Sequence, residues 1–315
     1  MAIVDAGNLF FKKDQLSPGV TTEIASVTAD IILAAFNEIG CDAFSPGSQD
    51  FALGLDFLLK MEKNANFPFV SANIKSATTG IHLFRPYQVV SKGGVSLGFI
   101  GLASQFTHPD LLIDDPIQAL KGIIEEVANQ VDLVVLLFNS EEKDILELQR
   151  SDLPIDMVYR SKSRKRSNDG GSKTIPVYSA GDRGKYLYDV TIAVKDKSLS
   201  FVDVTAQENA LKNATQRLDR MQKNHPEGTD LKVLFKDDPQ TLARVTNYER
   251  QVDEANYALT NAINSFTLTR HELNKTIVDK PEILKIIDAG KLKIAEFSAP
   301  QPAVPFTDPH AGHNH

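Results

Sequence analysis

The stretch Gly40-Cys-Asp-Ala-Phe-Ser-Pro-Gly-Ser-Gln-Asp-Phe-Ala-Leu-Gly54 decides how the first part of the chain folds. It begins as a short strand, turns at glycine and continues into a helix that starts near Leu55. Gly47 and Gly54 provide the backbone freedom that such turns need. Asp50 carries a carboxylate that can accept hydrogen bonds from the amides of the next turn. The stretch therefore predicts a strand, a tight loop and a helix in immediate succession.

The composition is that of an ordinary globular protein. Of the 315 residues, 42% are hydrophobic and 24% are charged, and the net charge is −7. A chain of this charge is a poor ligand for nucleic acid or for an acidic membrane surface. The single cysteine, Cys41, excludes an internal disulfide. No apolar run approaches the roughly 20 residues of a membrane-spanning helix, and no signal peptide is visible. We therefore expect neither nucleic-acid binding nor an integral membrane segment.

Strand and helix patterns alternate through the first two thirds of the chain. Val131–Leu137 is a continuous apolar run of strand length, which is typical of a strand buried on both faces. Asp115-Pro116 is a helix-start signal, and we expect that helix to run to Val127. Further strands are expected at Ile3–Phe11, Phe67–Ile74, Gln88–Ser91, Val95–Leu102, Ile155–Tyr159, Tyr188–Val194 and Leu199–Val204, and a helix at Thr28–Ile39. This alternation predicts an α/β sandwich.

Several of these stretches resemble motifs of the calcineurin-like metallophosphatases, most closely the branch of the 5'-nucleotidases and UDP-sugar hydrolases. Asp5-Ala-Gly-Asn8 resembles the family's Asp-Ala-Gly-Asp, and Gly47-Ser-Gln-Asp50 resembles its Gly-Asn-His-Asp. Phe67–Asn73 matches Phe-Pro-x-x-Ser-Ala-Asn, and Ile175–Leu187 also follows the family pattern. The resemblance covers residues 3–204. It implies a four-layer αββα sandwich, a protein in the periplasm or outside the cell, and a first strand that is missing ahead of Ile3.

The same resemblance implies that the metal-binding residues have been replaced. The family places metal-binding or catalytic Asp, Asn and His at six positions that hold other residues in this chain: Asn8, Ser48, Gln49, Asn139, Lys162 and Arg164. A neutral amide such as Asn8 cannot balance a pair of cations as a bridging carboxylate does. His82 and His108 do not lie at matching positions. We therefore expect no catalytic residue, no metal and no cofactor in residues 1–204.

After residue 204 the pattern becomes polar and helical. Three segments are expected: the sandwich at 1–204, a helical hairpin at 205–275, and a short helix with a flexible tail at 276–315. In the second helix of the hairpin, apolar residues recur every three or four positions, and the stripe includes Val252, Leu259 and Phe266. This stripe is expected to pair with the first helix of the hairpin, and any surplus is a candidate surface for a partner protein. Gly290 is expected to stop the short helix that begins at Pro281.

The preferred interpretation is a catalytically inactive binding or scaffold protein that associates with another protein through the hairpin. The resemblance extends to nucleotidase-like domains that are joined to, or act beside, multihaem cytochromes. An extracytoplasmic redox system with a multihaem cytochrome is therefore one expected setting for the partner, and the resemblance alone implies it.

Two other functions stay open. One is an active metal-dependent phosphoesterase of the 5'-nucleotidase type, whose site is misread or truncated in this sequence. The other is a metal-free receptor for phosphate or another anion, formed by a basic loop. The cations of this loop are Arg160, Lys162, Arg164, Lys165 and Arg166. In the tail, a group of three histidines could bind a transition metal weakly, namely His310, His313 and His315.

Overall fold

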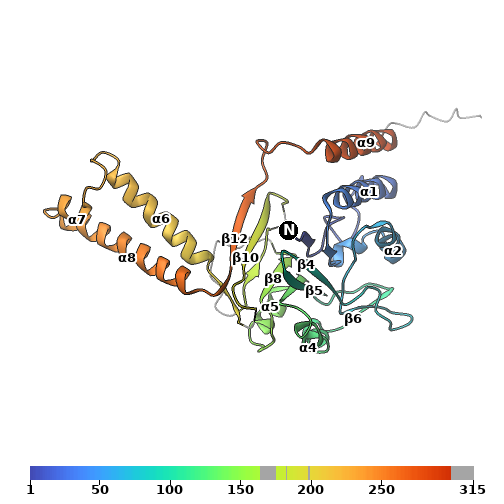
Figure 1. Ribbon diagram of the computed structural model, residues 1–315. Coiled ribbons are helices and arrows are strands. Elements are labelled where there is room, and N and C mark those ends of the chain that lie inside the picture. Colours follow the sequence, from blue (N-terminus) through green and yellow to red (C-terminus); the bar gives the residue numbers. More distant parts are fainter. Residues whose placement is uncertain (164–174, 182, 198, 299–315) are drawn as a thin grey trace, which may run out of the picture.

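A five-stranded sheet forms the centre of the molecule (Figure 1). The computed structural model describes residues 1–163, 175–181, 183–197 and 199–298. In spatial order, the strands of the sheet are β4 (Tyr87–Lys92), β5 (Val95–Ala103), β7 (Leu133–Asn139), β8 (Met157–Ser161) and β9 (Val177–Tyr178). β4 is antiparallel to β5, and the other neighbours are parallel. β7 is buried along its whole length, as its apolar run predicts.

One face of this sheet is covered by short helices. These are α3 (Pro116–Lys121), α4 (Ile124–Ala128) and α5 (Glu142–Leu148), whose apolar residues form one buried cluster with the sheet. The side chain of Asp115 caps α3, as its position predicts. The expectation of a single helix to Val127 is wrong, because Ile123 has left the helical conformation. Gly122 precedes this break, and glycine is among the least favourable residues for a helix interior.

The opposite face packs against a second layer of strands. This layer contains β1 (Val4–Asp5) paired with β2 (Ala43–Phe44), and β10 (Tyr186–Ala193), β12 (Asn264–Glu272) and β11 (Phe201–Asp203) paired in that order. Helices α1 (Thr22–Ile39) and α2 (Leu55–Asn64) lie outside β1 and β2. Ala43 contributes to the cluster between the layers, and Phe44 to the cluster under α1 and α2, as the two-residue period of a strand requires. The predicted αββα sandwich is confirmed.

A small pair of strands completes the sandwich. β3 (Ile74–Ser76) runs antiparallel to β6 (Leu111–Ile113). β6 contributes Leu111 and Ile113 to the phenylalanine-rich cluster under α1 and α2. The expected hairpin of Gln88–Ser91 and Val95–Leu102 is also confirmed, since β4 and β5 pair directly.

A buried carboxylate joins two loops of the second layer. Asp50, which is fully buried, lies in the 3-10 turn η1 (Ser48–Phe51). Its Oδ2 accepts hydrogen bonds from the amides of Asn8 and Gly47, both at 2.8 Å. Its Oδ1 accepts one from the amide of Phe10 at 3.0 Å. The side chain of Asp50 therefore fixes the loop after β1 against the loop after β2. The sequence predicts Asp50 as an acceptor for the amides of the next turn, whereas the amides it binds precede it in the chain.

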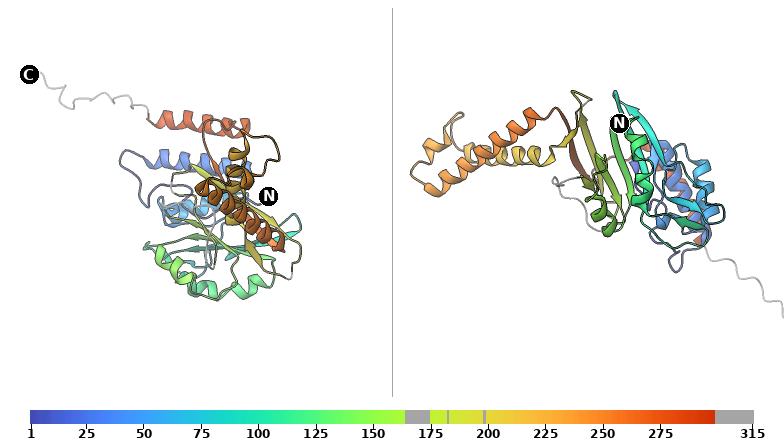
Figure 2. Two further views of the ribbon diagram at one scale, coloured as in Figure 1. Left: turned by 90° about the vertical axis from the view of Figure 1, so that its left-hand side faces the viewer. Right: turned by 90° about the horizontal axis from the view of Figure 1, so that it is seen from below.

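A two-helix arm projects from the sandwich (Figures 1 and 2). It consists of α6 (Thr205–Gln222), the short α7 (Leu231–Leu234) and α8 (Pro239–Asn261), and α6 packs along α8. The expected hairpin is present, but its predicted range is too long. Phe266 lies in β12 rather than in the helix and is 2% exposed, so it cannot belong to an exposed helical stripe. The division of the chain into domains at residues 204 and 275 stays a prediction.

The last described helix, α9 (Pro281–Ser298), packs on α1. It runs through Gly290, so the expectation that this glycine stops the helix is wrong. The reason is a close approach: a Cβ added at Gly290 would lie 2.1 Å from Cδ1 and 2.2 Å from Cγ1 of Ile31. Lys280 and Glu38 form an ion pair of 2.8 Å at one end of the helix pair. Within the described residues, no helix is both long enough and apolar enough to cross a membrane.

The buried carboxylates make stability depend on pH. Burial raises the pKa of Asp50 from 3.8 to about 6, although backbone hydrogen bonds oppose the shift. Burial raises the pKa of Asp5 to about 7. The folded chain therefore binds more protons than the unfolded chain between about pH 4 and 7, so stability falls as pH rises through this window. We expect a higher melting temperature at pH 5 than at pH 7.5, measured by circular dichroism.

The variant Asp50→Asn measures how much of this pH dependence of stability comes from Asp50. We expect a smaller difference between pH 5 and pH 7.5 in Asp50→Asn than in the wild type. The variant should also be less stable by about 1–3 kcal/mol, because an amide nitrogen cannot accept a hydrogen bond in place of a carboxylate oxygen. The matched control is Asp56→Asn, because Asp56 is exposed on α2 and should leave the pH dependence unchanged. An unaltered pH difference in Asp50→Asn would contradict the assignment.

The contact between Gly290 and Ile31 gives a second prediction. Gly290→Val should loosen α9 from α1 and lower stability by about 1–3 kcal/mol, because the added side chain overlaps Ile31. Limited proteolysis of the exposed segment 273–280 should become faster. Ala289→Val is the matched control, since Ala289 is an exposed neighbour on the same helix. If Gly290→Val and Ala289→Val have the same stability and the same rate of proteolysis, the close approach of α9 to α1 does not contribute to stability.

Candidate functional site

The ends of four strands meet at one edge of the sandwich. Hydrogen bonds join four of the six residues expected to replace metal ligands, namely Asn8, Ser48, Gln49 and Asn139, and a fifth, Lys162, directly follows Ser161, which bonds to Asn139. The sixth, Arg164, lies outside the described residues, as do Lys165 and Arg166. Parallel strands end at the same edge of a sheet, and α/β folds place ligands there. We call these five residues the strand-end cluster.

The two asparagines of the strand-end cluster are bonded to neighbouring loops. Asn8 Oδ1 accepts a hydrogen bond from the amide of Gln49 at 3.2 Å. Asn139, which is 1% exposed, accepts one from the amide of Ser48 at 3.4 Å. Its Nδ2 donates to Ser161 Oγ at 2.8 Å. The amide oxygens that a metal would need are therefore already used by the backbone of η1.

Gly47 lies between these two side chains. A Cβ at this position would lie 2.5 Å from Asn139 Cγ and 2.5 Å from Asn8 Oδ1. Only glycine leaves room for both amides to approach the turn. The glycine turn, which the sequence shows clearly, is thus the centre of the strand-end cluster.

Ser161 is a member of this site that the sequence did not reveal. Its Oγ donates to the carbonyl oxygen of Ala6 at 2.6 Å and accepts from Asn139. A serine beside a basic loop carries no recognisable signal, because its role depends on the meeting of β8 with the loop after β1.

Gln49 is turned toward the chain that follows β1. With its amide nitrogen facing that segment, it donates to the carbonyl oxygens of Phe11 at 2.9 Å and Lys12 at 3.2 Å. The side chain of Gln49, which the resemblance aligns with a catalytic histidine, therefore holds a loop.

Two backbone conformations at the site are unusual. Among the described residues, only Asn8 and Lys162 are non-glycine residues with positive φ, at 61° each. A left-handed conformation is uncommon for a residue with a side chain, and such residues concentrate at functional sites. Both positions belong to the strand-end cluster, so its loops keep a demanding geometry even with these side chains.

The described cations of the basic loop are paired within the chain. Lys162 Nζ lies 2.6 Å from Glu141 Oε1, and its hydrogen bond holds the pKa of that carboxyl below the usual range. Arg160 lies 2.6 Å from Glu142 and also donates to the carbonyl oxygen of Ser140. Both glutamates lie at the start of α5. These two cations are therefore neutralised by neighbours rather than left to hold an anion.

The described residues do not fit a dinuclear metal centre. They include no group of three or more histidine, cysteine, aspartate or glutamate side chains close enough to hold a metal. The carboxylate oxygens of Asp50 already accept hydrogen bonds from three amides, and Lys162 supplies an ammonium group, which cannot act as a metal ligand. The C-terminal histidines His310, His313 and His315 lie outside the described residues.

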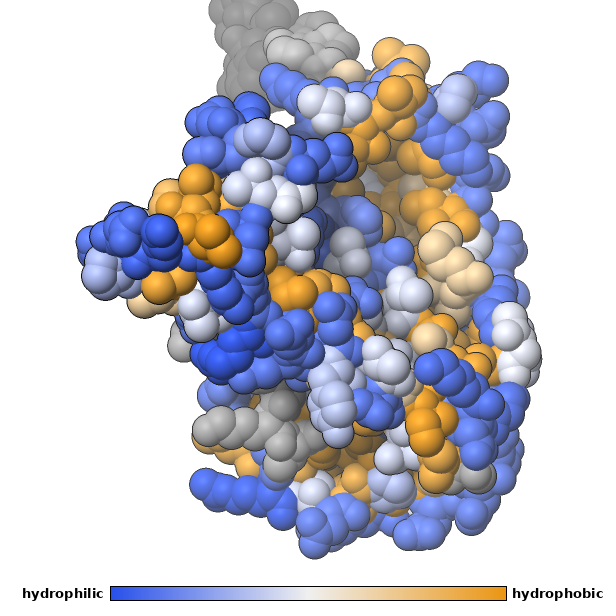
Figure 3. All heavy atoms as spheres, turned by 60° about the vertical axis from the view of Figure 1, so that its left-hand side comes forward, coloured by the Kyte–Doolittle hydropathy of each residue, from blue (hydrophilic) through white to orange (hydrophobic). Residues whose placement is uncertain are grey.

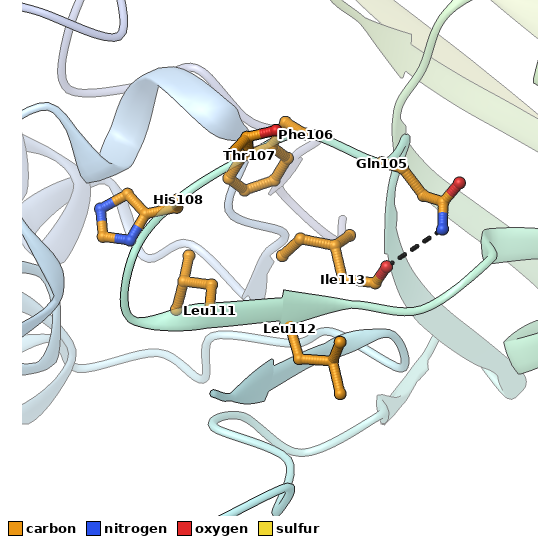
Figure 4. Close-up of a pocket in the computed structure, with 7 residues that line it drawn as sticks. All are labelled: Gln105, Phe106, Thr107, His108, Leu111, Leu112 and Ile113. Carbon is orange, nitrogen blue, oxygen red and sulfur yellow. Dashed lines mark hydrogen bonds between the residues drawn. The ribbon is translucent and has the colours of Figure 1, made fainter. Parts of the chain in front are cut away.

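A separate pocket of about 350 Å³ follows β5 (Figure 4). The rings of Phe106 and His108 lie 5.9 Å and 5.6 Å from that of Phe51, at the end of η1. Gln105 Nε2 donates to the carbonyl oxygen of Ile113 across the pocket, at 3.2 Å. His108 is one of the residues that line this pocket, and its Nδ1 lies 4.0 Å from Asp110 Oδ2.

Known proteins resemble the chain in sequence over limited segments. No family model matches it. The 5'-nucleotidase of Vibrio cholerae serotype O1 is 36% identical over 109 residues, which are 31% of this chain and 20% of that protein. The 5'-nucleotidase of Mus musculus is 31% identical over 170 residues, 49% of this chain and 28% of that protein. The chain thus spans 20% of the length of the first of these relatives and 28% of the length of the second.

Solved structures show the same fold. The 5'-nucleotidase precursor from Thermus thermophilus superposes with a TM-score of 0.52 at 22% identity, over 62% of this chain and 42% of that one. The calcineurin-like phosphoesterase YfkN from Bacillus subtilis superposes with a TM-score of 0.59 at 15% identity, over 94% of this chain and 84% of that one. The N-terminal part of this chain is therefore related to the 5'-nucleotidases and has the fold of the calcineurin-like metallophosphatases.

Proposed function

We propose that this chain is a catalytically inactive, metallophosphatase-like protein that binds another protein as a scaffold. The observation that carries the proposal is the strand-end cluster, whose asparagine side chains accept hydrogen bonds from the backbone of η1 and, in the case of Asn139, also donate to Ser161. A dinuclear phosphohydrolase needs carboxylates and imidazoles that converge on two metals and activate water. Here the converging groups are neutral amides and a lysine. Such a set supports loop structure and gives no route to hydroxide activation.

The two alternatives have less support. An active phosphoesterase would require the strand-end cluster to release Asn8 and Asn139 from the amides of η1 and still lack histidine ligands. A metal-free anion receptor would have to draw Lys162 and Arg160 away from Glu141 and Glu142. Each change would give up several hydrogen bonds or ion pairs before a ligand is bound.

The arm is the part of the molecule best placed to meet a partner. It projects from the sandwich, and its tip carries Val233, which is 64% exposed (Figure 2). Tyr257 on α8 is 75% exposed. Val252 and Leu259 are half-buried, so they contribute little free surface. We therefore move the candidate contact from the predicted stripe to the tip and outer side of the arm. An extracytoplasmic location and a multihaem cytochrome as the partner remain parts of this proposal, resting on the resemblance alone.

Metal content tests the loss of catalysis. The purified chain, with His310, His313 and His315 replaced by Ala, should retain less than about 0.1 equivalent of Mn, Fe or Zn after dialysis. Added metal should not start hydrolysis of AMP or UDP-glucose. The 5'-nucleotidase of Vibrio cholerae, prepared in parallel, is the positive control for AMP. Stoichiometric metal together with turnover would refute the proposal.

Charge substitutions test the arm. Phe266→Glu should destabilise the protein by about 3–5 kcal/mol, because it places a carboxylate in the buried core. Val233→Glu should leave the melting temperature nearly unchanged, because the residue is exposed, but should weaken association with a partner recovered from the native host. Lys236→Glu, an exposed charge change near the tip, is the control for a general electrostatic effect. Unaltered recovery with Val233→Glu would exclude the tip as the contact.

A further inference from the structure

The sequence contains two tripeptides of the kind to which transferases attach a sugar chain. The pattern is Asn-x-Ser/Thr, in which x is any residue except proline. It occurs at Asn213-Ala-Thr215 and at Asn274-Lys-Thr276. Both asparagines are exposed, so burial excludes neither of them. The pattern alone therefore gives two candidate acceptors, and the conformation of the chain must distinguish between them.

Asn213 lies within helix α6. Residues two apart on a helix do not face each other, so the side chain of Thr215 is directed away from the amide of Asn213. Ala214, between them, is fully buried in the arm. The tripeptide cannot leave the helical conformation unless this buried residue is exposed. Asn213 is therefore a poor acceptor in the folded chain.

Asn274 lies in the segment 273–280, which connects β12 to α9 and is exposed at every residue (Figure 1). Its Oδ1 accepts hydrogen bonds from the amide of Thr276 at 2.9 Å and from the hydroxyl of Thr276 at 2.6 Å. The amide of Ile277 donates to the carbonyl oxygen of Asn274 at 3.2 Å and closes the turn. Asparagine side chains favour such local turns. The asparagine and the threonine of this tripeptide are thus held side by side.

The side-chain nitrogen of Asn274 is available. Because a side-chain amide is planar, the bonds to Oδ1 leave Nδ2 on the opposite side, where it donates to no described residue. The segment is anchored at both ends. The amide of Leu273 donates to the carbonyl oxygen of Lys185 at 2.8 Å, and Lys280 forms its ion pair with Glu38. Nδ2 is therefore presented to solvent on an anchored loop.

The residues ahead of the two tripeptides also differ. Glu272 stands two positions before Asn274, whereas Leu211 stands two positions before Asn213. One class of transferase requires an acidic residue at this position in addition to the tripeptide. Asn274 therefore meets both the broader and the narrower pattern, and Asn213 meets only the broader one.

Exposed apolar side chains flank Asn274. Leu273 is 47% exposed, Ile277 50% and Val278 91%. The space-filling view shows apolar side chains among polar ones along the upper edge of the molecule, the side on which this segment runs in Figure 1 (Figure 3). A sugar chain is bulky and hydrophilic, so one attached at Asn274 would shield these apolar residues from other molecules.

We propose that Asn274 is an acceptor for N-linked glycosylation, and that the turn closed by Thr276 distinguishes it from Asn213. The inference rests on the extracytoplasmic location proposed above, because this tripeptide is an acceptor in secreted proteins. It does not depend on whether the strand-end cluster is catalytic.

The modification is a transfer of a glycosyl group. Nδ2 of Asn274 forms a bond to the anomeric carbon of an oligosaccharide that is carried by a lipid diphosphate. The bond between that carbon and the diphosphate oxygen breaks, and the lipid diphosphate leaves with the electron pair. Nδ2 gives up one proton to a base of the transferase, and nothing is oxidised or reduced. The modification therefore needs two partners, a lipid-linked oligosaccharide and its transferase.

Mass spectrometry of the full chain, purified from the native host, tests the proposal. The peptide that contains Asn274 should be heavier than its sequence by whole sugar residues and should release sugar fragments on collision. The peptide that contains Asn213 should have its unmodified mass. Thr276→Ala should lose the modification, whereas Thr276→Ser should keep it because serine restores the hydroxyl. Lys275→Ala, a change at the exposed middle position, is the matched control and should also keep it.

Cell fractionation in the same experiment separates this proposal from the proposed location. If the chain is recovered outside the cytoplasm with no sugar on Asn274, or with as much sugar on Asn213, the glycosylation proposal is overturned and the location stands. If the chain is recovered only from the cytoplasm, both are overturned. The proposed loss of catalysis is still decided by metal content and hydrolysis.

Discussion

The carboxylate of Asp50 is the interaction on which the arrangement of the strand-end cluster depends. It accepts hydrogen bonds from three amides in two loops that are about 40 residues apart in sequence. Burial alone would favour its neutral form, and its pKa is raised for that reason, yet three donors keep the oxygens in place. The frame of the site is therefore held by a residue that need not touch a metal.

The backbone and the side chains of the strand-end cluster have different roles. Asn8 and Lys162 retain left-handed backbones, which are costly for residues with side chains. Their side chains, however, bond to the chain itself: Asn8 to the amide of Gln49, and Lys162 to Glu141. A binding site normally keeps polar groups available for its ligand. Here the side chains of Asn8 and Lys162 already have partners within the chain. The loops therefore have an unusual backbone geometry, while their side chains make internal contacts instead of contacts with a ligand.

The sequence predicts the parts of this molecule that depend on local pattern. The buried run of β7 and the α6–α8 pairing follow from periodicity. Phe266 was misassigned because it continues a spacing of three and four while also fitting the alternation of β12 with Leu268. Gly290 was misassigned because its reason is a tertiary contact with Ile31, which no local signal reports.

The candidate site likewise has a part that the sequence predicts and a part that it does not. Its members could be grouped from the sequence because the resemblance to the metallophosphatases aligns them with that family's metal-binding positions. Their partners could not be predicted. The pairing of Lys162 with Glu141 depends on where α5 begins beside β8, and the bond from Ser161 to Ala6 joins residues 155 apart in sequence. Long-range pairing of this kind is decided by packing, so the sequence suggested a free basic loop where the structure has ion pairs.

Polar side chains hold the first strand of the second layer in place. β1 is two residues long and pairs with a single described strand, which is too little to fix it by sheet hydrogen bonds. Side chains replace the missing neighbour: Asp42 accepts from the amide of Ile3, Ser161 donates to Ala6, and Asp50 accepts from the amide of Asn8. The carboxylate of Asp42 thus fixes the residue before β1, and Ser161 and Asp50 fix residues after it. Side-chain hydrogen bonds at both ends therefore supply for this two-residue strand the fixation that neighbouring strands give to a longer one.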